Sequence, residues 1–229
     1  MTSPGTLLAL ALDTADLEQA VGWATVLGPH VDVMKVGLQL FVSAGPVAVE
    51  KVRAASGLDV FLDAKLDDIP NTVAGAARAA AAMGVGWLTV HTGAGAAACA
   101  AAAEATAGST TRLLGVTLLT SLEGRDLKTL GMAADLGGVV DKRARLAAAA
   151  GLEGVVCAGP DQPIVAAAAP ALLRVIPGVR MEGSPAGDQS RVGTPAEAAR
   201  DGAAMIVVGR PITTAADPVA AAVAIRAQL

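Results

Sequence analysis

The segment from 63 to 72 contains the residues of this chain whose types and spacing are best suited to chemistry. It reads Asp-Ala-Lys-Leu-Asp-Asp-Ile-Pro-Asn-Thr and follows the apolar run 59–62, which we expect to be a buried strand. Asp63 and Lys65 are two residues apart, so both side chains project from the same face of a strand. Asp68 follows within reach, near the start of the next predicted helix.

This cluster predicts a proton donor that is held in a fixed place beside negative charge. A lysine on an apolar strand is costly to bury unless opposite charges compensate it. Nearby carboxylates favour the ammonium form of Lys65 over the free amine. Lys65 is therefore suited to deliver a proton at a defined point next to anionic groups.

The length and composition suit a single domain with a large core. The chain has 229 residues, of which 53% are hydrophobic and 17% are charged, and we expect one domain over residues 1–229. Much of the apolar excess is alanine, a strong helix former, in tracts such as 96–103 and 147–150. We expect no membrane-spanning segment, because every long apolar run is interrupted by polar residues, and no signal peptide.

Charge and residue usage exclude several classes of function. The net charge is −4, the basic residues are scattered, and aromatic residues make up only 2%, so a nucleic-acid surface is not expected. Cys99 and Cys157 form no CxxC motif; we interpret them as buried free thiols in a reducing cytoplasm. His30 and His91 cannot form a zinc site with ligands at motif spacing.

Eight apolar runs recur along the chain, and we expect them to be strands alternating with helices. They are 7–13, 31–37, 59–66, 87–92, 112–120, 154–158, 172–176 and 205–208. Continuous apolar runs are typical of a parallel sheet covered by helices, so the pattern predicts an α/β fold, a (β/α)8 TIM barrel. The alternative is a doubly wound open sheet, which usually has a glycine-rich loop after its first strand; the segment 12–16 has none.

Polar residues stand at the ends of these predicted strands, where a barrel of this kind has its catalytic groups. In chain order they are Asp13, Lys35, Asp63 with Lys65, His91, Thr120 with Ser121, and Gly209 with Arg210. The alternative interpretation is that the two lysines form only structural ion pairs at the edge of the sheet. Convergence of two lysines and several aspartates on one rim favours the catalytic interpretation.

The segments after the last two predicted strands indicate a phosphate site. The segment 176–191 is long and rich in glycine and proline and carries arginines and Gln189; a surface loop without function is the alternative. Gly209 leaves room for a ligand, and Arg210 can bind phosphate oxygens in a fork. Loops after strands seven and eight form the usual phosphate site of such barrels. The residues thus predict an enzyme for a phosphorylated small molecule, with no evident organic cofactor.

The chain resembles the orotidine 5′-phosphate decarboxylase family. The resemblance lies in the motif Asp-x-Lys-x-x-Asp-Ile-Pro-Asn-Thr at 63–72 and in shorter motifs at the expected strand ends. These are 11–13, 35–37, 119–121, 177–180, 187–189 and 209–212. The resemblance extends from about residue 7 to the C-terminus. It implies decarboxylation of orotidine 5′-monophosphate to uridine 5′-monophosphate, the last step of de novo pyrimidine biosynthesis, with no metal or organic cofactor.

The resemblance also implies roles for individual residues. Asp13 and Lys35 would hold the ribose hydroxyls, Asp63 would lie beside the substrate carboxylate, and Lys65 would protonate C6 of the pyrimidine. The other implied substrate contacts are Thr120 or Ser121 on the pyrimidine ring, Pro177 in the mobile loop over the base, and Arg180, Gln189, Arg210 and the Gly209 amide on the 5′-phosphate.

The working unit implied by the resemblance is a homodimer. Asp68 and Thr72, with Ile69 between them, would complete the site of the partner subunit. The chain departs from the family pattern at Ile176, where a threonine is frequent, and in the segment 181–185. Neither departure removes a residue with an implied role, but both concern how the loop after the seventh strand closes.

Two alternatives remain open at this point. Related sugar-phosphate lyases share the Asp-x-Lys-x-x-Asp motif but use Mg²⁺ held by a glutamate at the second strand, where this chain has Lys35. A cation there repels a divalent metal. The second alternative is a barrel that binds a nucleotide without turning it over.

Overall fold

The protein is a closed barrel of eight parallel strands. The computed structural model describes residues 5–132, 135–181 and 193–229. The strands are β1 (Leu7–Ala11), β2 (Val33–Gly37), β3 (Asp59–Leu66), β4 (Trp87–His91), β5 (Arg112–Val116), β6 (Gly154–Val156), β7 (Leu173–Pro177) and β8 (Met205–Val208). They follow one another around the barrel in chain order, and β8 pairs with β1 to close it. The predicted TIM barrel is confirmed.

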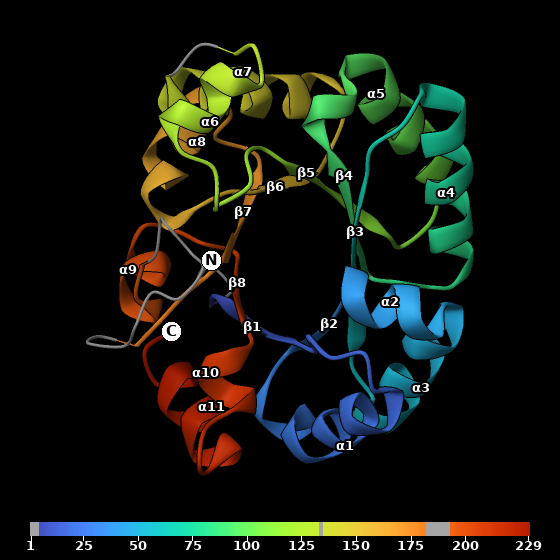
Figure 1. Cartoon of the computed structure of the whole chain (residues 1–229), viewed down its shortest axis with the longest axis vertical. Coiled ribbons are helices and arrows are strands. Elements are labelled where there is room, and N and C mark those ends of the chain that lie inside the picture. The colour runs from blue at the N-terminus through green and yellow to red at the C-terminus, as the bar shows by residue number, and fades with distance from the viewer. Residues whose placement is uncertain (1–4, 133–134, 182–192) are drawn as a thin grey trace.

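Helices surround the strands on the outside of the barrel (Figure 1). The α-helices are α1 (Leu17–Leu27), α2 (Leu38–Ala44), α3 (Pro46–Ser56), α4 (Pro70–Ala82), α5 (Ala96–Thr106), α6 (Gly124–Thr129), α7 (Leu136–Ala149), α8 (Gln162–Ala168), α9 (Pro195–Arg200), α10 (Arg210–Thr213) and α11 (Pro218–Arg226). Short 3-10 helices are η1 (Gly28–His30), η2 (Thr92–Ala94) and η3 (Gly159–Asp161). Among the described residues, no helix has both the length and the apolar character needed to cross a membrane.

The apolar strands form two cores, because alternate residues of a strand point to opposite faces. In β1, Leu8 and Leu10 pack with the surrounding helices, whereas Ala9 packs inside the barrel. Phe61 and Trp87 also belong to the inner core and fill the barrel. This double burial explains why the strands read as continuous apolar runs in the sequence.

Local signals explain where several helices begin. The Asp16 carboxylate accepts hydrogen bonds from the backbone N–H groups of Glu18 and Gln19 and so caps α1. Asp217 caps α11 in the same way, through the N–H of Ala220. α5 consists mostly of alanine, whose small side chain lets helices approach closely.

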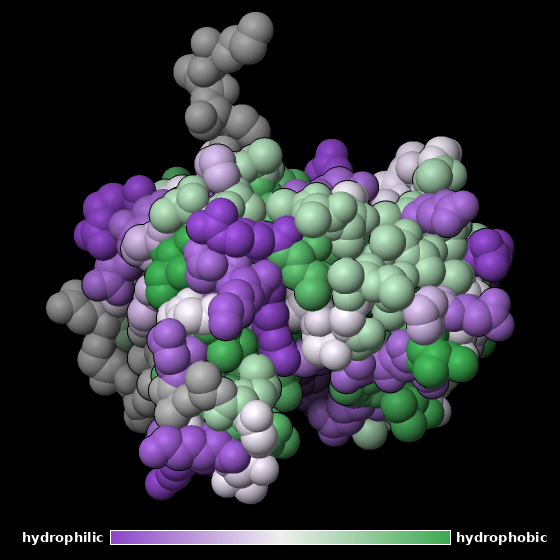
Figure 2. Space-filling model, turned by 90° about the horizontal axis from the view of Figure 1, so that it is seen from above, coloured by the Kyte–Doolittle hydropathy of each residue, from purple (hydrophilic) through white to green (hydrophobic). Residues whose placement is uncertain are grey.

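The surface mixes weakly apolar and polar residues. On the face shown in Figure 2, broad areas of weakly apolar, pale green residues lie beside polar, purple ones.

The strand ends differ from the sequence prediction at the mouth of the barrel. β1 ends at Ala11 rather than at residue 13, and β5 ends at Val116 rather than at residue 120. In both cases the chain leaves the hydrogen-bonded ladder to line the cavity described below. α2 was not predicted, and it occupies the connection between β2 and α3. Cys99 and Cys157 are buried free thiols, as expected.

Candidate active site

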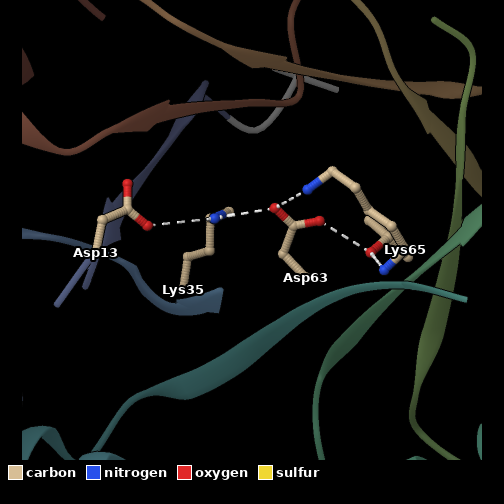
Figure 3. Close-up of polar contacts among 5 residues, drawn as sticks. Asp13, Lys35, Asp63 and Lys65 are labelled. Atoms are coloured by element: carbon tan, nitrogen blue, oxygen red, sulfur yellow. Dashed lines mark hydrogen bonds and ion pairs between the residues drawn. The ribbon is translucent and has the colours of Figure 1, made fainter. Parts of the chain in front are cut away.

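Four charged side chains form a row at the carboxyl ends of β1, β2 and β3 (Figure 3). The Lys65 Nζ lies 2.8 Å from the Asp63 Oδ2, and the Lys35 Nζ lies 2.9 Å from the same oxygen. The Lys35 Nζ also lies 3.8 Å from the Asp13 Oδ1. Positive and negative charges therefore alternate from Asp13 to Lys65 across the mouth of the barrel.

Asp63 is buried and carries the negative charge shared by the two lysines. Asp63 is only 7% exposed, and burial by itself raises the pKa of a carboxyl group. The positive charges of Lys35 and Lys65 outweigh burial and lower the pKa of Asp63 to about 2. Burial likewise lowers the pKa of Lys35, but Asp63 and Asp13 reverse this, so that the pKa lies above its ordinary value. Both groups are therefore charged at neutral pH.

Thr89 holds this arrangement from β4, and the sequence analysis missed it. Its hydroxyl donates a hydrogen bond of 2.9 Å to the Asp63 Oδ1 and accepts one of 2.8 Å from the Lys65 backbone N–H. The side chain is fully buried. The available signal was a hydroxyl within the apolar strand β4, where a buried polar group needs partners.

The backbone at Lys65 is bent away from regular strand geometry. Lys65 has φ of +48°, the only positive value of a non-glycine residue among the described positions, and the register between β3 and β4 shifts between Leu62 and Leu66. A bulge of this kind re-aims a side chain and is frequent next to active sites. Here it accompanies the turn of Lys65 toward Asp63.

Two glycines leave room for the charged row. A Cβ atom on Gly37 would lie 3.1 Å from the Lys35 Nζ and 3.3 Å from the Asp13 Oδ1. A Cβ atom on Gly209 would lie 3.3 Å from the Ala11 Cβ and 3.4 Å from the Asp13 Oδ2. Both contacts are tight, so glycine allows backbone and charged side chains to lie close together here.

The row lines a cavity of about 590 Å³ that contains most of the residues singled out from the sequence. The volume suits a nucleotide-sized ligand, within the usual range of small-molecule sites. Sequence-predicted residues on its wall are Asp13, Lys35, Asp63, Lys65, Thr120, Ser121, Pro177, Arg180, Gly209 and Arg210. Gln39 of α2 also lines it and was not predicted. Gln189 lies outside the described residues.

Asp68, Ile69 and Thr72 are not among the residues that line this cavity. All three are exposed. β3 ends at Leu66, and the following turn carries the chain to the surface. The Asp68 Oδ1 accepts a hydrogen bond of 2.6 Å from the Ile69 backbone N–H. Within the described part of the chain, the ion pair of Lys65 is with Asp63.

The donor set of the cavity suits anions and hydroxyl groups better than a metal ion. The Lys35 ammonium occupies the space between the carboxylates of Asp13 and Asp63, where it would repel a divalent cation. Across the described ranges, no three His, Cys, Asp or Glu side chains are grouped so that they could hold a metal.

A closed barrel of parallel strands with a charged cluster at its carboxyl end is the arrangement of (β/α)8 barrel enzymes. Comparison with known proteins narrows this class. The sequence model of the family described as "Orotidine 5'-phosphate decarboxylase / HUMPS family" matches residues 6–225. The chain therefore belongs to this family.

Individual relatives are similar to this protein in sequence or structure over nearly the whole chain. An orotidine 5'-phosphate decarboxylase of Anaeromyxobacter sp. (strain K) is 49% identical over 227 residues, which cover 99% of each chain. That of Thermobifida fusca is 46% identical and covers 97% of this chain and 95% of its own. The crystal structure of the enzyme from Lactobacillus acidophilus is similar with a TM-score of 0.83 and 33% identity, over 98% and 99% of the two chains.

Proposed function

We propose that this protein decarboxylates orotidine 5′-monophosphate to uridine 5′-monophosphate and CO₂, the last step of de novo pyrimidine biosynthesis in the cytoplasm. The observation that carries the proposal is the row Asp13, Lys35, Asp63 and Lys65 inside a nucleotide-sized cavity. The family and the full-length relatives that bear this name support it.

Lys65 is the proton donor to C6 in this proposal. Loss of CO₂ leaves an electron pair at C6 that the ring delocalises poorly, so positive charge must be placed where negative charge develops. The Lys65 ammonium is partly exposed to the cavity and is held by Asp63 at 2.8 Å. After the C6–CO₂ bond breaks, the electron pair takes a proton from this ammonium, and Lys65 becomes a neutral amine until solvent protonates it again.

Asp63 and Lys35 prepare the site for this step. Asp63 is ionised at any physiological pH, because its pKa is about 2, and it would lie beside the substrate carboxylate. Repulsion there raises the energy of the bound substrate, and departure of CO₂ relieves it. Asp13 and Lys35 would bind the ribose hydroxyls from the other end of the row.

The remaining wall of the cavity would bind the base and the phosphate. Thr120 or Ser121 would contact the pyrimidine ring, and Pro177, the last residue of β7, would mark the start of the loop over the base. Arg180, Arg210 and the Gly209 amide lie on the β7 and β8 side of the same cavity and would bind the 5′-phosphate; Gln189 is assigned to the phosphate by family resemblance. Because the phosphate is remote from the bond that breaks, its binding energy can drive closure of the site.

The proposal includes a homodimer in which each subunit completes the site of its partner. The exposed Asp68, Ile69 and Thr72 have no place in the cavity of their own chain. Ile69 is 66% exposed, and Leu38 and Val42 of α2 in the same chain are 49% and 80% exposed. Exposed large apolar residues are frequent at interfaces, and the motif residues Asp68 and Thr72 would reach the cavity of the partner subunit.

An assay of the purified protein tests the activity directly. Absorbance of orotidine 5′-monophosphate should decrease on addition of enzyme, with no effect of EDTA. Activity on a sugar phosphate that disappears with EDTA would instead support the alternative of a related, Mg²⁺-dependent sugar-phosphate lyase of the same barrel superfamily. Tight binding of uridine 5′-monophosphate without any turnover would support the non-catalytic barrel.

A further inference from the structure

A second cavity lies directly behind Lys65. Its volume is about 330 Å³, and it shares Lys65, Leu118 and Leu119 with the first cavity. The segment 118–121 after β5, which carries the two hydroxyl residues proposed to contact the base, therefore begins as a partition between the two spaces. Contacts from the side of the second cavity can therefore act on this segment.

Arg143 adds a second cation, besides Lys65, to the wall of this cavity. Asp67, His91 and Arg143 all line the second cavity. The His91 Nδ1 accepts a hydrogen bond of 3.0 Å from the Gly93 N–H, so this nitrogen carries no proton, and the Asp67 Oδ2 is 3.9 Å away from it. Burial and the charge of Arg143 lower the pKa of His91. With its Nδ1 accepting this hydrogen bond, His91 is neutral in this arrangement, and the negative charge of Asp67 raises the pKa of both His91 and Arg143 against the effect of burial.

Arg143 also reaches from α7 to the carboxyl end of β5. Its Nη1 donates a hydrogen bond of 2.5 Å to the Thr117 carbonyl oxygen. Thr117 is fully buried, and its N–H and its hydroxyl both donate to the Val156 carbonyl of β6, at 3.1 and 3.0 Å. The residue that precedes the partition is therefore held on both sides, by β6 and by Arg143.

We propose that Arg143 is a positioning residue for the pyrimidine ring. By holding the Thr117 carbonyl, it sets the segment 118–121 at the distance from Lys65 that contact with the base requires. Arg143 lines the second of the two cavities and is not among the residues that line the first, in which the substrate is proposed to bind. The inference rests on the proposed function, because it assigns the pyrimidine ring to the wall at Thr120 and Ser121.

Calorimetric binding of two ligands to the full-length protein tests this role. Uridine 5′-monophosphate occupies the base, ribose and phosphate regions, whereas ribose 5-phosphate lacks the base. Arg143→Met should weaken binding of uridine 5′-monophosphate by roughly 10- to 100-fold, the usual effect of losing a hydrogen bond to a charged group. Binding of ribose 5-phosphate should stay unchanged. Arg143→Lys, which keeps the charge and one donor, should recover part of the loss.

Arg145→Met is the matched control. Arg145 lies on the same helix but is exposed and bonds only to Asp141 among the described residues, so both ligands should bind as in the wild type. Unchanged binding of uridine 5′-monophosphate to Arg143→Met, or an equal loss for both ligands, would overturn the inference.

A folding defect does not remove the test. If Arg143→Met does not fold, the ratio of the two affinities in Arg143→Lys decides: a ratio equal to that of the wild type contradicts the positioning role. Failure of the wild type to bind uridine 5′-monophosphate or to decarboxylate its precursor would count against the proposed function instead.

Discussion

Asp63 is the residue around which the charges of the cavity are arranged, because it contacts both lysines and Thr89. Its three partners come from β2, β3 and β4. A buried ion pair is stable only when geometry and further hydrogen bonds compensate the loss of hydration, and removal of one partner leaves a costly unpaired charge. Single substitutions in this group should therefore affect both catalysis and stability.

Replacement of Lys65 should separate the effect on catalysis from the effect on stability. Lys65→Ala should lower kcat by about 10⁴-fold or more, because it removes the group proposed to act as the general acid and to place positive charge at the reacting carbon. The side chain is 30% exposed, so the protein should remain folded. Stopped and continuous absorbance assays measure the loss, with the exposed Lys142→Ala as a control of unchanged activity. Near-normal turnover of Lys65→Ala would refute the proton-donor role.

Replacement of Thr89 tests the support of the row. Thr89→Val keeps the shape of the side chain but leaves the Asp63 Oδ1 and the Lys65 N–H without their partner. The free energy of unfolding should fall by about 1–3 kcal/mol, and kcat should fall with it. Urea denaturation and steady-state kinetics measure these changes. Thr89→Ser keeps the hydroxyl and should behave nearly as the wild type; an equal loss in both variants would show that the methyl group matters instead.

The low pKa of Asp63 predicts a pH-dependent contribution to stability. Because the folded pKa is about 2 and the unfolded value is about 4, the contribution is complete above pH 4 and is lost as pH falls toward 2. Its size is roughly 2–3 kcal/mol. The difference in unfolding free energy between wild type and Asp63→Asn, measured by urea denaturation from pH 6 to pH 2, should shrink over this window. A constant difference would contradict the shift.

At the scale of elements, the carboxyl ends of the strands decide what each side chain can reach. β3 has the bounds predicted from the sequence, since its apolar run ends in charged residues. β5 is shorter than predicted, because Leu118 and Leu119 after it line cavities rather than continue the ladder. β1 also ends early: Leu12 packs in the core, and Asp13 lines the first cavity. Apolar character marks burial but does not distinguish a strand from a cavity wall.

Arg210, in the segment after β8, is proposed to bind the 5′-phosphate, and its replacement tests this role. Arg210→Ala should raise KM roughly 10- to 100-fold, the usual effect of a lost charge-assisted hydrogen bond. Phosphite dianion should activate decarboxylation of a substrate that lacks the phosphate in the wild type, but much less in the variant, because the binding energy of the separate anion drives closure. Unchanged kinetics of Arg210→Ala would remove Arg210 from the phosphate site.

At the scale of the whole molecule, the proposed homodimer gives the exposed motif residues of one chain a place in the site of the other. Lys65→Ala and Asp68→Asn homodimers should each have little activity. In a hybrid dimer, one site combines the intact Lys65 of one subunit with the intact Asp68 of the other. Mixing the two variants should therefore restore up to about a quarter of wild-type activity per subunit, as expected for random exchange in a two-fold dimer. Activity that stays at the mean of the two homodimers would show that Asp68 acts within its own chain.

The sequence by itself determined the barrel, the order of its eight strands and the placement of Asp13, Lys35, Asp63 and Lys65 at one rim, because hydrophobic runs and spacing along a strand are local properties. Only the tertiary structure decided the contacts of Thr89, Gln39 and Arg143 and the outward course of the chain at Asp68. These depend on which residues barrel closure brings together from distant parts of the chain, and local sequence patterns carry no information about such distances.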